Sequence, residues 1–181
     1  MRDPGEQPLS LRQWPVLCIA CEKPIYGFAI ARLLSREGSL GQIWQVSKPA
    51  VYRAILRLEQ LGLVQADGQE PTNVGPDRSL VTATRTGRSA ARMWLRTPVA
   101  HGRDVRSELM IKLALLARAG DDPQDLLSRQ RAAFGPLAAT LADQVQNTTG
   151  MDRTLALWRH EMMSATTQFL DQATGMPKSS S

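Results

Sequence analysis

The feature that most constrains the fold of this chain is a break in helical periodicity at Gly62. Before it, apolar residues recur at helical spacing in three segments, residues 10–21, 26–36 and 47–61. After it, residues 63–64 and 79–82 are short β-type runs, separated by a turn-rich stretch over residues 67–76. Thr84 is typical of a helix N-cap and opens a fourth helix. The order helix, helix, helix, hairpin, helix predicts a small helical domain with one hairpin.

The second half of the chain is predicted to be helical throughout. One helix is expected over residues 104–117, and a longer one follows Pro123. Asp152 caps a last helix, whose apolar side chains fall on one face at Leu155, Trp158, Met162, Ala165, Phe169 and Ala173. Two long amphipathic helices with so little else to pack against are expected to bury part of their surface on another chain. The fold class is therefore mainly α.

Charge and composition narrow the classes of function. Residues 1–100 carry 13 basic and 8 acidic side chains, whereas residues 101–181 carry 9 of each, so the whole net charge of +5 lies in the first part. This asymmetry favours a partner that is a polyanion. The longest apolar run, residues 14–21, is too short to span a bilayer, and no secretory signal opens the chain. We expect a cytoplasmic protein that makes no contact with a membrane.

The third predicted helix has two different faces. Its apolar residues form a narrow stripe around Val51, while Lys48, Tyr52, Arg53 and Arg57 lie on the opposite arc. Such a helix is often only a solvated surface helix. Here, however, a short helix and a turn precede it and a hairpin follows it, which is the layout of a winged helix-turn-helix. A helix that reads a DNA groove needs this division between a packed side and a side of hydrogen-bond donors.

These segments resemble the PadR-type transcriptional regulators, in the branch with a long C-terminal domain. The resemblance rests on residues 26–27, 44–47, 51–59, 62–64, 84, 87–88 and 94–95, which follow the order and spacing of the family. It implies a winged helix-turn-helix domain at residues 9–98 and a helical dimerisation domain at residues 103–174. It also implies a homodimer that binds double-stranded DNA.

The resemblance further implies which residues contact DNA and how the protein acts. The expected contacts are Tyr26, Ser47, Lys48, Tyr52, Arg53, Arg57 and, on the wing, Arg78. The wing departs from the family pattern, because Arg78 is its one cation and Asp77 lies beside it. We expect a sequence-specific repressor of an inverted-repeat operator, with half-sites about one helical turn apart. A small-molecule effector or a partner would release it.

Two short motifs do not support an enzyme or a metal site. Cys18 and Cys21 form a C-x-x-C pair, but no second pair of Cys or His completes a four-ligand zinc site. They are expected to be small core residues, although a thiol sensor is left open. His160-Glu161 begins an H-E-x-x-H motif that Ser164 breaks. We therefore expect no catalytic residues, no metal and no cofactor.

Two further hypotheses remain open from the sequence. Trp94 and Trp158 flank the expected junction between the two domains, and we expect an aromatic effector to bind there, near Trp94. The alternative to a DNA-binding regulator is a winged-helix module that docks another protein. The neutral second half and the weak wing favour this alternative.

Overall fold

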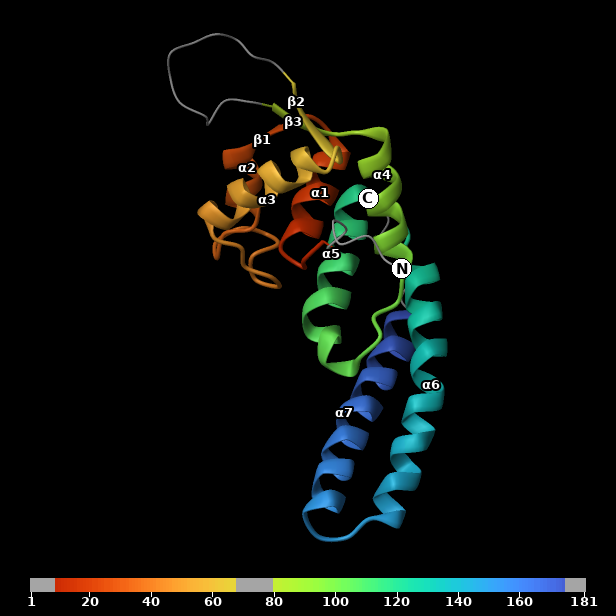
Figure 1. Cartoon of the computed structure of the whole chain (residues 1–181). Coiled ribbons are helices and arrows are strands. Elements are labelled where there is room, and N and C mark those ends of the chain that lie inside the picture. The colour runs from red at the N-terminus through yellow and green to blue at the C-terminus, as the bar shows by residue number, and fades with distance from the viewer. Residues whose placement is uncertain (1–8, 68–79, 175–181) are drawn as a thin grey trace, which may run out of the picture. The chain divides into compact units, whose positions relative to one another are not determined.

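The computed structural model describes residues 9–67 and 80–174 (Figure 1). The chain divides into two compact units, Met1–Leu95 and Arg96–Ser181. The first unit contains the predicted order of helices and strands, and the second is helical. The prediction of a mainly α chain with a winged helix-turn-helix domain is confirmed.

Helix α1 (Gln13–Glu22) is the core of the first unit. Its residues from Pro15 to Ala20 are all buried, on every side of the helix. This burial arises because α1 contacts both helix α3 (Lys48–Gln60) and strand β3 (Leu80–Ala83). Pro15 is tolerated because the N–H groups of the first helical turn have no partner within the helix.

A three-stranded antiparallel sheet, in the order β1-β3-β2, completes the wing. Strand β2 (Val64–Asp67) pairs with β3 as the predicted hairpin, while the tip, residues 68–79, lies outside the described residues. The short strand β1 (Ile25–Tyr26) was not predicted. Tyr26 has an extended backbone and pairs with Leu80, so helix α2 (Gly27–Leu33) begins one residue later than its apolar spacing suggests.

Thr84 fixes the start of helix α4 (Arg85–Arg96), as predicted. Its hydroxyl accepts a hydrogen bond from the Gly87 N–H, at 3.1 Å, and donates one to the Gly62 carbonyl, at 2.7 Å. A Cβ at Gly87 would lie 1.9 Å from the Leu63 carbonyl oxygen, so this position admits only glycine. The cap and the glycine together hold α4 against the end of α3.

The second unit begins with a short 3-10 turn (Gly102–Asp104) and a π-helical turn (Val105–Leu109), so the single helix predicted there is interrupted. Helices α5 (Met110–Ala119), α6 (Gln124–Asn147) and α7 (Gly150–Thr174) follow. Gly120 and Gly150 have φ angles of 73° and 57°, which allow the sharp turns between these helices. In the described residues, no helix is both long enough and apolar enough to cross a membrane.

Helices α6 and α7 pack side by side (Figure 1). The buried side chains of α7 are Ala156, Met163 and Leu170, which recur every seven residues as in a coiled-coil seam. The stripe predicted from the sequence is therefore not the one that meets α6. Its members Leu155, Trp158 and Met162 are 41%, 62% and 49% exposed. Because α7 packs on α6 along this seam, the other apolar row of the helix faces outward.

Two buried polar side chains hold the segment that follows α4. Gln130 of α6 is fully buried and bonds both backbone groups of Val99, at 2.7 Å to its N–H and 3.0 Å to its carbonyl. Lys112 of α5, 1% exposed, donates to the Thr97 carbonyl at 2.8 Å and pairs with Glu108 at 2.6 Å. Both buried polar side chains therefore have partners, which removes most of the cost of burying them.

Replacing Gln130 by Leu is expected to lower the free energy of unfolding by about 1–3 kcal/mol, because the N–H and carbonyl of Val99 would remain buried without partners. Urea denaturation followed by circular dichroism measures this loss. The matched control is Gln146→Leu, at an exposed position of the same helix. Equal stability of the two variants would contradict the role given to Gln130.

Candidate nucleic-acid interface

Helix α3 presents a cationic face because its opposite face is held in the core. Val51, Ala54 and Leu58 are buried against the rest of the first unit. On the outer arc, Lys48 and Arg53 are exposed, and Tyr52 and Arg57 are half-buried. The helix carries three basic side chains and one acidic one, Glu59. Its outward side therefore offers positive charge and several hydrogen-bond donors to a single partner.

The start of α3 gathers three of the predicted contacts. The Lys48 ammonium lies 5.7 Å from the centre of the Tyr52 ring, within the range of a cation–π interaction. Ser47 is the N-cap residue, yet its side chain makes no capping hydrogen bond. Its exposed hydroxyl is thus not used by the helix end. Residues 47, 48 and 52 form one polar surface at the beginning of the helix.

The segment Tyr26-Gly27-Phe28 lies against this surface. A Cβ placed on Gly27 would be 3.0 Å from Cε1 of Tyr52 and 3.3 Å from Cδ1 of Ile55, so the glycine lets α2 approach α3 closely. Tyr26 is 40% exposed and stacks on the ring of Phe28, with centroids 5.6 Å apart. The structure thus brings Tyr26 close to the predicted residues of α3.

Phe28 is a surface residue that the sequence analysis missed. It is 47% exposed although it belongs to a helix with a buried side. The sequence does contain a signal for this exposure. Phe28 follows Gly27 by one residue, so its side chain is rotated by about 100° around the helix axis from the buried glycine. The wing residue Arg78 falls outside the described residues.

The two tryptophans predicted for an effector differ in their surroundings. Trp94 is 7% exposed and stacks on Trp14 of α1, with centroids 5.1 Å apart and planes 4° from parallel. It joins α1 to α4 within the first unit. Trp158 belongs to the second unit and is 62% exposed. Trp94 is therefore part of the core of the first unit, whereas Trp158 lies on the surface of a helix of the second unit.

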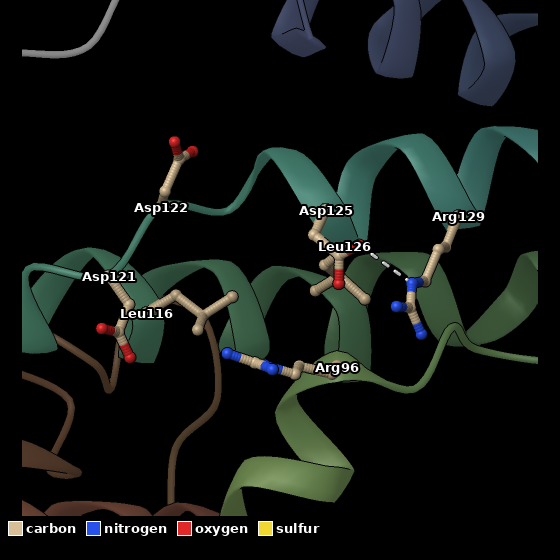
Figure 2. Close-up of a pocket in the computed structure, with 7 residues that line it drawn as sticks. All are labelled: Arg96, Leu116, Asp121, Asp122, Asp125, Leu126 and Arg129. Carbon is tan, nitrogen blue, oxygen red and sulfur yellow. Dashed lines mark hydrogen bonds and ion pairs between the residues drawn. The ribbon is translucent and has the colours of Figure 1, made fainter.

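A separate pocket of about 330 Å³ lies at the start of α6 (Figure 2). Its lining residues are Arg96, Leu116, Asp121, Asp122, Asp125, Leu126 and Arg129. Asp125 and Arg129 form an ion pair at 3.0 Å, which neutralises one charge of each sign. Neither Trp94 nor Trp158 lines this pocket, and it offers no aromatic ring for stacking. Its chemistry suits a small polar molecule rather than a planar aromatic one.

The two cysteines have the environment of core residues. Cys18 is buried, and burial raises the pKa of the half-buried Cys21 thiol to about 11, partly offset by the nearby cations Arg88 and Arg92. A thiol with a raised pKa is a poor nucleophile at neutral pH. Across residues 9–67 and 80–174, no group of three or more His, Cys, Asp or Glu side chains is placed to hold a metal ion.

Several solved structures are similar to this chain. Bacillus subtilis PadR in complex with operator DNA is 16% identical, with a TM-score of 0.47, over 93% of this chain and all of that one. The structure of Bacillus subtilis PadR in complex with p-coumaric acid has a TM-score of 0.44 and 15% sequence identity. The match covers 92% of this chain and 98% of that one. The structure of the Vibrio cholerae virulence activator AphA has a TM-score of 0.41 and 21% sequence identity. The match covers 91% of this chain and 96% of that one.

A family model matches part of the first unit. No curated protein matches the chain. The model of the transcriptional regulator PadR-like family, however, matches residues 16–93. This range begins in α1, contains α2, α3 and the described strands, and ends in α4, so it includes the cationic face and the cap that positions it. The segment that carries the cationic face is therefore similar to the PadR-like family of transcriptional regulators.

Proposed function

We propose that the chain is a sequence-specific DNA-binding regulator that acts as a homodimeric repressor. Its DNA-binding domain comprises residues 9–98 and its dimerisation domain residues 103–174. The observation that carries the proposal is the outward face of α3, where Lys48, Tyr52 and Arg53 project from a helix whose other side is buried. A helix fixed in this way can enter a major groove without losing its orientation.

The residues of this face divide by role. Lys48 and Ser47, at the start of the helix, are placed to contact base edges, because the first turns of a recognition helix reach deepest into the groove. Tyr52, Arg53 and Arg57 supply phosphate contacts on either side. Tyr26 directly precedes Gly27, which lies close to Tyr52, and adds a hydroxyl donor at the edge of the same surface. Arg78 of the wing is proposed as a weaker phosphate contact.

The Arg57→Ala variant is expected to bind every duplex more weakly and to lower the slope of log K against log salt by about one, since one phosphate contact is lost. Fluorescence anisotropy with the DNA upstream of the chain's own gene, and with a scrambled duplex, measures both quantities at several salt concentrations. Arg103→Ala, which alters an exposed arginine of the second unit, is the control.

Two outcomes would change this reading. A loss confined to the upstream duplex would show that Arg57 reads bases instead of phosphates. A wild-type chain that binds neither duplex at low salt would contradict the DNA-binding proposal. That result would favour the alternative, a winged-helix module that docks another protein.

The exposed stripe of α7 supports the proposed homodimer. Met151, Leu155, Trp158 and Met162 lie on one side of the helix, roughly 110° from the seam that packs on α6. An exposed row of large apolar side chains is characteristic of a surface that meets another protein. A second copy of α7 offers the same row, so a two-fold arrangement would cover both. A dimer carries two recognition helices, one for each half-site of an inverted-repeat operator.

Trp158→Glu is expected to weaken the dimer by at least tenfold, because a carboxylate would be buried in the apolar contact. Analytical ultracentrifugation over a concentration series measures the dissociation constant. Gln168→Glu adds the same charge to an exposed position of α7 away from the stripe, and its dimer should be unchanged. A monomeric wild-type chain, or equal effects of the two variants, would contradict the proposed interface.

We also propose that a small aromatic effector releases the DNA by binding near Trp94. What supports this proposal is the stacking chemistry of Trp94, whose ring already lies parallel to that of Trp14. Titration with p-coumaric acid should quench tryptophan fluorescence in the wild type and quench it less in Trp94→Phe. Undiminished quenching in the variant would remove Trp94 from the site.

A further inference from the structure

The stacked pair of Tyr26 and Phe28 is an exposed apolar surface next to a cationic one. The two rings lie 5.6 Å apart and 16° from parallel, with 40% and 47% of the residues exposed. Stacking favours this mutual arrangement of the two rings. A fixed, half-exposed aromatic pair differs from a lone surface phenylalanine, because its position is already set before any partner arrives.

This pair is continuous with the outward face of α3. Gly27, between the two aromatic residues, lies close enough to α3 that a Cβ there would be 3.0 Å from Tyr52. Tyr52 in turn lies beneath the Lys48 ammonium. Helices α2 and α3 run side by side in the first unit (Figure 1). A partner that covers Lys48 and Tyr52 therefore reaches the aromatic pair as well.

The chemistry of Phe28 differs from that of its neighbours. Its ring has no hydrogen-bond donor, so it gains nothing from a phosphate oxygen. In a helix-turn-helix, the first helix crosses the DNA backbone while the second enters the groove. The backbone presents deoxyribose rings between its phosphates, and these are its apolar surfaces. A phenyl ring on the first helix complements a sugar, whereas a tyrosine hydroxyl beside it complements a phosphate.

We propose that Phe28 packs against a deoxyribose of the DNA backbone, while Tyr26 hydrogen-bonds an adjacent phosphate. Phe28 thus provides a contact that neither reads sequence nor depends on salt. The inference rests on the proposed DNA binding and adds an apolar component to it. The stacking of the two rings keeps Phe28 at the sugar and Tyr26 at the phosphate.

The test compares Phe28→Ala with the wild type in the anisotropy titrations over a range of salt concentrations, using the upstream and scrambled duplexes. Phe28→Ala should bind both duplexes about fivefold more weakly, the loss expected from part of a phenyl contact. Its slope of log K against log salt should equal that of the wild type, because no counterion-releasing contact is removed. Phe28→Tyr, which keeps the ring, should retain nearly all of the affinity.

Met93→Ala is the matched control, because Met93 is an exposed apolar residue on α4 of the same unit, and its affinity should be unchanged. The inference is overturned by wild-type affinity in Phe28→Ala, by a changed salt slope, by an equal loss in Met93→Ala, or by a loss confined to the upstream duplex. Any of these results with normal wild-type binding leaves the proposed function standing. A wild-type chain that binds no duplex overturns both.

Discussion

The winged unit depends on the burial of α1 on every side. A helix that is apolar all round has no solvent face, so other elements must cover it. Helix α3 and strand β3 do this, and Trp94 covers a further part through its stack on Trp14. Side chains such as Leu17 and Ile19, which are fully buried, contribute about 1.5–3 kcal/mol each relative to exposure. The covering elements have little freedom to turn.

That lack of freedom is what gives α3 a usable outer face. Val51 and Leu58 are held in the core, and the helical repeat then places Lys48, Tyr52 and Arg53 outward. The net charge of the first hundred residues indicated a polyanion partner, but its sum includes cations far from this face. The positions of the cations on α3 are a better guide to the partner than the net charge, because charges on one rigid surface act on the same partner. The same rigidity fixes the apolar pair of Tyr26 and Phe28 at its edge.

The second unit is organised around the packing of two long helices. Helices α6 and α7 share a seam of Ala156, Met163 and Leu170, and this leaves a second apolar row of α7 outside. Gln130, meanwhile, ties the segment after α4 to α6 through both backbone groups of Val99. In this helix pair, α6 is bonded to the segment after α4, and α7 exposes the apolar surface of the proposed dimer.

Local patterns in the sequence determined most of the winged fold. The stripe of α3, the cap at Thr84 and the β-type runs depend on neighbouring residues, and the structure agrees with each of them. Tertiary structure alone decided three other features. The strand at Tyr26 needs a partner 54 positions along the chain, Leu80. The seam of α7 depends on how closely α6 approaches, and the exposure of Phe28 depends on where Gly27 meets Tyr52. Periodicity shows that a helix has an apolar face, but only the neighbouring elements decide which face is buried.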